Sequence, residues 1–504
     1  MKTNWSEFQK AIFNFVESGK GSLVVNAVAG SGKTTTIVEC ARRAKTHNVL
    51  FLAFNKSIVN ELQSRMPNVV CSTLHACGLS AIRRAFAKFN VDSNGYYWRE
   101  RIKAYIQNEI GDCKELFGIT KDAVKLFNLC RLELLKHSDK EGVVAVADHH
   151  NIEVSEVVMD AVLYALTTAY EVRFVGQTAQ IDYTDMIVLP NVNPTVKKYV
   201  TKHNLVFIDE AQDLNKAQRG LMLLSVAKGG RFVAVGDPRQ AINGFAGANN
   251  DSFNQLAKLA DKELPLSCNY RCGSDIISLA QDIVPNIVAH EGASKGIIRN
   301  VTNLKDANIG DMILCRKSAP LVLVALKFLS KNIRAKVLGR EIANGLASLI
   351  KKTNVRRIDT LLDKLAIQIE KAEALHAVSP KEMSIVKLES LKDKVNAIEA
   401  IAENIDPKAN NGVSQLLSKM EDLFTDNNDK KSQITLATCH KSKGLENERV
   451  FILLPEKLPL VWKGQKDWQY EQEMNLKYVA ITRAKNELVW VDVMEDELAK
   501  IEVR

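Results

Sequence analysis

The sequence of 504 residues has no long apolar run, few cysteines and no strong excess of charge of either sign. No stretch approaches the ~18 consecutive apolar residues of a membrane-spanning helix, which argues against an integral membrane protein. The N-terminal segment contains Glu7 and lacks the apolar centre of a signal peptide. We therefore expect a protein of a reducing, cytosol-like compartment.

Nine cysteines are too few for a disulfide scaffold, and their spacing lacks the CxxC pairs and histidine partners of a zinc site. Hydrophobic residues make up 46% and charged residues 25%, which excludes disorder, collagen and coiled-coil rods. The net charge of +9 permits a polyanionic partner such as nucleic acid without requiring one. The length is sufficient for about three or four compact units.

Short apolar runs alternate with helical segments along much of the chain. Strands are predicted over 23–25, 49–53, 205–208 and 232–235. This alternation is typical of parallel sheets flanked by helices, so the predicted fold class is α/β.

Two segments interrupt the alternation. Residues 89–177 are polar and helix-like, and residues 341–432 are almost purely helical, with two apolar stripes at three- to four-residue spacing. The stripes are Leu361, Leu362, Leu365, Ile369, Ala372 and Leu375, then Leu388, Leu391, Val395, Ile398 and Ile401. Between them, Ser379-Pro380-Lys381-Glu382 matches a capping box at the start of the second helix. The hairpin is either a packed insertion, which we favour, or an arm that docks a partner.

A small-residue loop, Gly30-Ser-Gly-Lys-Thr34, follows the first predicted strand and matches a P-loop. Its glycines let backbone N–H groups surround phosphate oxygens, and the helix that follows adds its positive end. Lys33 would reach the β- and γ-phosphates, and the Thr34 hydroxyl would ligate Mg²⁺. Ala27 stands where the first glycine of the motif is usual.

Two adjacent acids, Asp209 and Glu210, end the third predicted strand. Asp209 would hold Mg²⁺ through water, and Glu210 would orient and deprotonate the attacking water. Alone, the two acids could be surface turn residues. Together with the P-loop, they indicate an NTPase that uses ATP.

Further motifs occur in a fixed order along the chain: Ala53-Phe-Asn-Lys56, Thr73-Leu-His-Ala-Cys-Gly78, Asp182-Tyr-Thr-Asp185, Gly236–Ala248, Asn269-Tyr-Arg271, Thr438–Glu446 and Tyr478–Lys485. This series resembles the motif set of the UvrD/Rep-like superfamily 1A DNA helicases, most of all the compact branch with phage-encoded members and F-box DNA helicases. The resemblance implies two RecA-like P-loop NTPase lobes, each with a mainly helical insertion. The expected boundaries are 1–88 and 178–262 for lobe 1A, 89–177 for insertion 1B, 263–340 and 433–504 for lobe 2A, and 341–432 for a reduced insertion 2B.

The resemblance also implies an ATP site between the lobes. By motif position, the cofactor-binding residues are Gln9, Ala29, Gly30, Ser31, Gly32, Lys33, Thr34, Thr35, Tyr270 and Glu446, and the catalytic residues are Lys33, Glu210, Gln240, Arg271 and Arg483. Gln9 would read adenine, Tyr270 would stack on it, and Glu446 would contact the ribose. Arg271 and Arg483 would bind the γ-phosphate, which Gln240 would sense. Each of these side chains could instead be a surface or salt-bridge residue.

For single-stranded DNA, the resemblance implies contacts from Phe54, Asn55, Thr73, His75, Phe245, Thr438 and His440. The phenylalanines would stack on bases, although phenylalanine is more often a core residue. Three features depart from the family: Phe245-Ala-Gly-Ala replaces Trp-Arg-Gly-Ala and Asn243 replaces an aromatic residue two positions earlier, Thr35 replaces an adenine-stacking arginine, and the 341–432 insertion is small.

The predicted function is an ATP- and Mg²⁺-dependent helicase that moves 3′ to 5′ on single-stranded DNA and opens duplex at junctions. The alternatives are a translocase that displaces proteins with little unwinding, and a P-loop ATPase independent of nucleic acid. Single-strand-binding or recombination proteins would be suitable partners, in the cytoplasm of a bacterium or a phage-infected cell. Outside the two interrupting segments, the chain carries 44 basic and 30 acidic residues, so the positive excess lies on the motif-bearing part.

Overall fold

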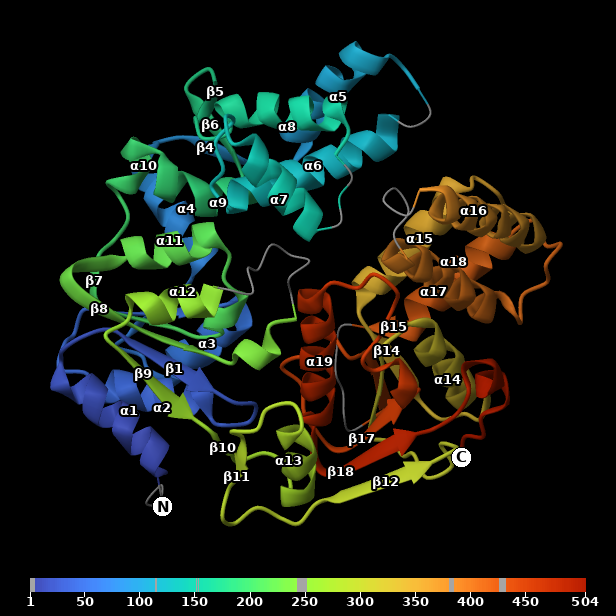
Figure 1. Cartoon of the computed structure of the whole chain (residues 1–504). Helices are drawn as coiled ribbons and strands as arrows, with labels where there is room; N and C mark the ends of the chain where they lie inside the picture. Colours follow the sequence, from blue (N-terminus) through green and yellow to red (C-terminus); the bar gives the residue numbers. More distant parts are fainter. Residues whose placement is uncertain are drawn as a thin grey trace. The chain divides into compact units, whose positions relative to one another are not determined.

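The computed structural model describes residues 5–113, 116–150, 152, 154–242, 252–379, 385–425 and 432–504. The chain forms two compact units, Met1–Cys268 and Asn269–Arg504 (Figure 1). Over these described ranges, no helix is both long enough and apolar enough to span a lipid bilayer.

The first unit is built on a six-stranded parallel sheet with the strand order β3-β2-β7-β8-β1-β9. Its strands are β1 (Leu23–Ala27), β2 (Val49–Ala53), β3 (Val70–Thr73), β7 (His203–Ile208), β8 (Val226–Gly236) and β9 (Lys262–Leu266). The four strands predicted from apolar runs all lie within this sheet. Because β9 pairs with β1, the first unit runs to Cys268 and not to residue 262.

Helices cover both faces of this sheet because its strands are apolar on both sides. Leu23 and Val25 of β1 belong to one core and Val24 to the other. The first core lies under α1 (Glu7–Ser18), α2 (Lys33–Arg43) and α3 (Lys56–Arg65), and the second under α4 (Leu74–Ala85), α9 (Tyr183–Val192), α11 (Lys216–Leu224) and α12 (Ser252–Leu259). A short helix, α10 (Pro194–Lys197), follows α9.

The first insertion, residues 89–177, has a hydrophobic core of its own, centred on Trp98 and Phe127. Its helices are α5 (Tyr96–Ile110), α6 (Leu116–Leu132), α7 (Lys140–His149) and α8 (Glu156–Thr168). A small sheet of β4 (Phe89–Asp92), β6 (Thr178–Asp182) and β5 (Arg173–Val175) crosses the predicted boundary, because β6 belongs to the chain that returns to the lobe.

The second unit is built on a seven-stranded parallel sheet with the order β12-β18-β17-β13-β16-β14-β15. Its strands are β12 (Ile297–Val301), β13 (Met312–Cys315), β14 (Ala335–Leu338), β15 (Phe424–Thr425), β16 (Ile434–Thr438), β17 (Asn447–Leu453) and β18 (Ala484–Val491). The helices beside it are α13 (Ser274–Gln281), α14 (Ala319–Ser330) and α19 (Asp467–Ile481), and β10 (Cys268–Asn269) with β11 (Val288–Ala289) form a two-stranded sheet. Parallel sheets flanked by helices confirm the predicted α/β class.

The second insertion, residues 341–432, shares one hydrophobic core with this sheet. Its helices are α15 (Arg340–Lys352), α16 (Ile358–Val378), α17 (Ile385–Ala402) and α18 (Gly412–Leu423). Leu361 and Leu365 of α16 and Ile398 of α17 lie in the same core as Ile313 and Leu436 of the sheet. The favoured prediction of a packed insertion is therefore confirmed. Pro380, Lys381 and Glu382 of the predicted capping box lie outside the described residues.

Candidate nucleotide and nucleic-acid sites

The P-loop connects β1 to α2 at the carboxyl edge of the first sheet. Gly30 and Gly32 have φ of 65° and 76°, a left-handed backbone that glycine adopts without strain. Lys33 begins α2, so the helix N-terminus faces the loop as phosphate binding requires. Gln9 lies beside the loop: it completes a capping box with Ser6 at the start of α1, and its Nε2 donates to Thr36 Oγ1 at 3.0 Å.

Thr34 and Asp209 meet at the base of the P-loop. The Thr34 hydroxyl donates to Asp209 Oδ2 at 3.0 Å. A hydroxyl and a carboxylate are hard oxygen donors, which Mg²⁺ prefers, and phosphate oxygens with water complete such sites. The two side chains therefore fit the predicted metal site. Burial, followed by the charge of Glu210, raises the pKa of Asp209 to about 6, against the opposing effect of Lys33.

Glu210 adopts an unusual backbone conformation at the end of β7. Its φ is 52°, in the left-handed region that non-glycine residues occupy at a cost of ~1–3 kcal/mol. Its carboxylate is 3.5 Å from Lys33 Nζ and accepts a hydrogen bond from Gln212 Nε2 at 2.6 Å. The strained turn places this carboxylate beside the P-loop lysine, the position expected for the predicted general base.

A chain of hydrogen bonds extends from Glu210 to the next strand. Gln212 Oε1 accepts from the backbone N–H of Asp237 at 3.0 Å, and Gln240 Nε2 donates to Asp237 Oδ2 at 2.8 Å. Burial raises the pKa of Asp237, against the opposing effect of Lys33. Gln240, the predicted γ-phosphate sensor, is thus linked through Asp237 and Gln212 to the predicted base.

The predicted DNA contacts of the first unit follow the two strands at one end of the same carboxyl edge. Phe54 comes directly after β2 and is 55% exposed, so the alternative of core packing is excluded for it. Asn55 caps α3 and Thr73 caps α4, and His75 is exposed in the first turn of α4. Asn243 and the predicted stacking residue Phe245 lie outside the described residues.

In the second unit, the predicted nucleotide residues gather at the amino edge of the sheet. Glu446 directly precedes β17, and Arg271 Nε donates to its Oε2 at 2.7 Å. Lys485 Nζ lies 2.9 Å from the other carboxylate oxygen of Glu446. Tyr270 is 39% exposed, with its ring centroid 4.9 Å from that of His290. Glu446 therefore forms the salt bridge that the sequence left open as its alternative role.

Arg483, which directly precedes β18, is 1% exposed. Its Nε donates to the carbonyl oxygen of Val479 at 2.9 Å, and its NH1 donates to that of Leu445, also at 2.9 Å. These bonds tie the end of α19 to the loop before β17. In this conformation the guanidinium supports the amino edge of the sheet, a structural task that the motif alone did not indicate.

The predicted DNA contacts of the second unit lie at the opposite, carboxyl edge. Thr438 ends β16, and it lines a cavity of about 610 Å³ together with His440. The same cavity is lined by Arg316, Lys317, Lys457 and Trp462, which lie outside the motifs, and by Lys441, to which its motif gave no role. Burial, followed by the positive charge of Arg316, lowers the pKa of His440 to about 3, so its imidazole is neutral near pH 7.

The cationic side chains of this cavity are paired with acids, several of them from the second insertion. Lys317 Nζ lies 3.0 Å from Glu495 and 3.5 Å from Glu389, and Lys441 pairs with Glu341. Lys317 and Trp462 lie far apart in the sequence, and neither belongs to a motif with a fixed residue spacing. The only sequence signal for Lys317 was its position two residues after an apolar strand.

Comparisons with known proteins agree with these motifs. The UvrD/REP helicase N-terminal domain matches residues 6–261, and the UvrD-like helicase C-terminal domain matches residues 331–493. F-box DNA helicase protein 1 of Schizosaccharomyces pombe is 24% identical over 94% of this chain and 56% of its own length. The ATP-dependent DNA helicase PcrA of Staphylococcus aureus is 25% identical over 61% of this chain and 44% of its own.

A solved structure, an arterivirus nonstructural protein 10 helicase with DNA, covers 97% of this chain and 64% of that one, at 11% identity and a TM-score of 0.34. That similarity is too weak for a comparison of the two folds. The chain spans about half the length of the curated relatives it matches. Because the N-terminal domain family alone matches half of the chain, the protein belongs to the UvrD/REP helicase family.

Proposed function

We propose that the protein is an ATP-dependent DNA helicase that translocates on single-stranded DNA. One observation carries the proposal: the carboxyl edge of the first sheet holds both the Lys33–Glu210 and Thr34–Asp209 pairs and, after β2, the strand adjacent to β7, the exposed ring of Phe54. An NTP site and a base-stacking residue on one rigid edge are what a motor on nucleic acid needs. Apart from the boundary at residue 262, the domain boundaries expected from the motifs belong to this proposal.

The ATP site would use the side chains of the first unit for binding and water activation. Gln9 lies beside the P-loop for adenine recognition, Lys33 would bind the β- and γ-phosphates, and Glu210 would accept the proton of the attacking water. Thr34 and Asp209 would hold Mg²⁺, which neutralises phosphate charge when bound. Arg271 and Arg483 of the second unit would stabilise the charge on the γ-phosphate, so that closure of the two lobes completes the site.

DNA would contact both units. Bases would stack on Phe54 and Phe245, while Thr73 and His75 would hold the phosphate backbone at the first edge. In the second unit, Thr438, His440 and Lys441 line a cavity with room for a nucleotide, and Trp462 offers a further ring. The salt bridges of Lys317 and Lys441 would exchange for phosphate contacts when DNA enters.

The family resemblance supports movement in the 3′ to 5′ direction, with duplex opened at the junction of single and double strands. It also supports single-strand-binding or recombination proteins as partners in a cytoplasmic setting. The proposal therefore includes the direction of movement, the opening of duplex at the junction, the partners and the cytoplasmic setting.

A strand-separation assay tests the proposal. Partial duplexes with either a 3′ or a 5′ single-stranded tail are incubated with ATP and Mg²⁺, and release of the labelled strand is measured. We expect release from the 3′-tailed substrate and none with Lys33→Ala. Preference for the 5′ tail would overturn the direction, and release that Lys33→Ala retains would overturn the use of this ATP site.

One observation favours a second function, a translocase that displaces bound proteins with little unwinding. The second insertion is packed into the core of its unit through Leu361 and Leu365, unlike a separate regulatory domain. A single-stranded oligonucleotide carrying a tightly bound protein separates the two functions. Displacement of that protein without strand separation would favour the translocase, and strand separation at a comparable rate would favour the helicase.

A further inference from the structure

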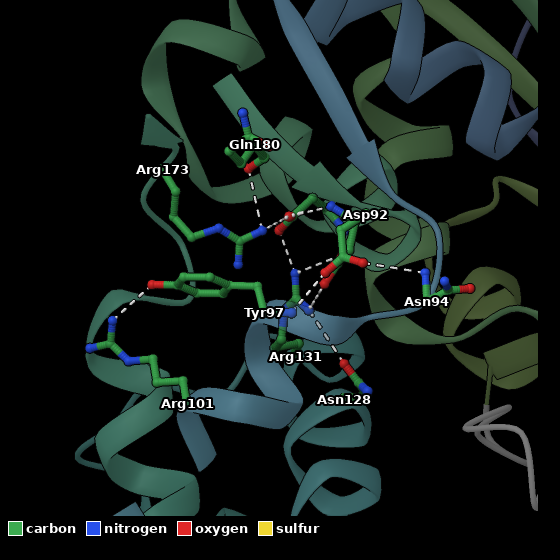
Figure 2. Close-up of polar contacts among 10 residues, drawn as sticks. Asp92, Asn94, Tyr97, Arg101, Asn128, Arg131, Arg173 and Gln180 are labelled. Carbon is green, nitrogen blue, oxygen red and sulfur yellow. Dashed lines mark hydrogen bonds and ion pairs between the residues drawn. The ribbon is translucent and has the colours of Figure 1, made fainter. Parts of the chain in front are cut away.

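The first insertion meets the lobe through a cluster of buried charges, Arg131, Arg173, Asp182 and Asp185. Figure 2 shows the two arginines and their polar contacts. Arg131, near the end of α6, is 0% exposed and donates from NH1 to Asp182 Oδ2 at 2.8 Å and from NH2 to Asp182 Oδ1 at 3.2 Å. Its NH2 also donates to Asp185. Arg173 of β5 donates to the other oxygen of Asp185 at 3.3 Å. Two cations therefore balance two carboxylates.

Both arginines are held by aromatic rings of the first insertion. The Arg131 guanidinium carbon lies 5.2 Å from the ring centroid of Phe127 and 5.6 Å from that of Trp98. The Arg173 guanidinium carbon lies 4.2 Å from the ring centroid of Tyr97 and 4.7 Å from that of Trp98. Such contacts favour a desolvated guanidinium over an aromatic face. The cationic half of the cluster is thus fixed to the core of the insertion.

The two carboxylates form the capping box that begins α9. The Asp185 backbone N–H donates to Asp182 Oδ1 at 2.7 Å, and the Asp182 N–H donates to Asp185 Oδ2 at 2.8 Å. Each carboxylate therefore binds both an arginine of the insertion and the first turn of a lobe helix. Displacement of Arg131 would disturb the start of α9 as well as the insertion.

α9 links the charge cluster to two neighbouring helices, because it packs closely against a glycine of each. A Cβ atom at Gly78 of α4 would lie 1.6 Å from the carbonyl oxygen of Met186, and one at Gly220 of α11 would lie 2.2 Å from Asn191 Oδ1. Helices that approach this closely have little freedom to shift against each other. α4 begins directly after Thr73 and carries His75, two of the predicted DNA contacts.

We propose that Arg131 is a positioning residue for single-stranded DNA. Through Asp182, Asp185 and the α9–α4 contact, it fixes the first insertion relative to the DNA-facing edge that carries Thr73 and His75. The inference rests on the proposed function, since it assigns a consequence for DNA binding. The buried ion pairs fix the first insertion in one position relative to the lobe. A charge-neutral replacement keeps the stability of the protein but loses that position.

The test compares Arg131→Met, the double variant Arg131→Met/Asp182→Asn, and Arg131→Lys. Arg131→Met leaves two buried carboxylates with one cation, so we expect a large drop in the thermal unfolding midpoint. The double variant restores the charge balance, and asparagine still caps a helix, so its midpoint should return to within a few degrees of wild type. Lysine retains the charge but not the bidentate geometry, and it provides a second folded variant.

The decisive readout is the affinity for a labelled oligothymidine in the absence of ATP. We expect the double variant to bind about tenfold more weakly than wild type, a factor that corresponds to ~1.4 kcal/mol, with nucleotide affinity unchanged. Arg131→Lys should fall between them. Arg231→Met is the matched control, because Arg231 is also buried but bonds to the carbonyl of Val16 at the end of α1; it should leave DNA affinity unchanged.

A double variant that recovers both stability and wild-type DNA affinity would overturn the positioning role, because the cluster would then act on stability alone. The failure of the proposed function looks different. In that case the wild-type protein itself would show no affinity for the oligothymidine.

Discussion

The two units have the same kind of sheet but place their candidate residues differently on it. In the first unit, the P-loop, Asp209 and Phe54 all follow the carboxyl ends of parallel strands. In the second unit, Glu446 and Arg483 precede strands, whereas Thr438 ends one. The first sheet thus holds its candidate nucleotide and DNA residues at one edge, and the second holds them at opposite edges.

This difference indicates that the two units have different roles. In the first unit, Lys33 lies within hydrogen-bonding reach of Glu210 and Thr34 of Asp209, so under the proposed function this unit would bind the phosphates and the metal. The second unit has cations at its amino edge and, at its carboxyl edge, the cavity proposed to take DNA, on opposite sides of a rigid sheet. A rigid sheet with a ligand at each edge can convert movement at one ligand into movement at the other.

The two insertions also differ, in how each is attached to its unit. The first has its own core and joins its unit through buried ion pairs, whereas the second shares the core of its sheet. The first is therefore the part that charge substitutions should loosen, and the second should unfold only together with its sheet.

The largest effect is expected at the amino edge of the second sheet. Replacing Arg271 by alanine should lower the rate of ATP hydrolysis about 10³-fold, as loss of a γ-phosphate arginine does, while the affinity for ATP changes little. Lys485→Ala removes the other partner of Glu446 and is the matched control, with an expected change of a few-fold. Equal losses in the two variants would show that Glu446 pairing, and not γ-phosphate binding, is the role of Arg271.

The second-largest effect is on stability, and it distinguishes the two insertions. Leu365→Ala should destabilise the second unit by about 2–5 kcal/mol, because it opens a cavity in a core that insertion and sheet share. Ile102→Ala, in the separate core of the first insertion, should have a similar local cost but leave the first sheet protected. Hydrogen exchange of the strand amides measures both. Faster exchange in the first sheet with Ile102→Ala would contradict the distinction.

A smaller effect is expected at the DNA edge of the first sheet. Phe54→Ala should weaken binding of single-stranded DNA by ~1–3 kcal/mol, the value of one base stacked on an aromatic ring. Tyr199→Ala is the control, because Tyr199 is also exposed but precedes β7 at the amino end of the strands. Fluorescence anisotropy with an oligothymidine gives both affinities, and equal losses would remove Phe54 from the DNA site.

The smallest effect concerns pH and His440. Its folded pKa of about 3 lies below the ordinary value of 6.5, so below pH 6.5 the unfolded chain takes up a proton that the folded protein does not. The contribution to stability is therefore present above pH 6.5 and lost as pH falls, by at most about 1.4 kcal/mol per pH unit. Denaturant unfolding of wild type and His440→Asn between pH 7 and pH 5.5 should show a shallower slope for the variant. Identical slopes would show that His440 is accessible to protons when folded.

Much of the fold could be predicted because its signals are local. The four apolar runs are strands, and the helical stripes of Leu361 and Ile398 are buried, since periodicity directly reflects burial. The expected boundary at residue 262 falls inside β9, whose run, Lys-Glu-Leu-Pro-Leu, has no β-branched residue and owes its place to pairing with β1.

The site was predictable where a motif fixes both residue type and spacing, as for Lys33 with Thr34 and for Asp209 with Glu210. Arg131 gave no such signal, because it meets Asp182 across 51 positions of the chain and only the folded insertion brings them together. Arg483 shows the converse: the motif identified the residue, but its backbone contacts depend on the packing of α19.

The most direct test of the central claim is the steady-state rate of ATP hydrolysis with and without single-stranded DNA, measured for wild type and Lys33→Ala. If one protein couples the nucleotide edge to the DNA edge, DNA should stimulate hydrolysis strongly, and Lys33→Ala should abolish the activity under both conditions. Equal wild-type rates with and without DNA would contradict the account and indicate a P-loop ATPase that acts independently of nucleic acid.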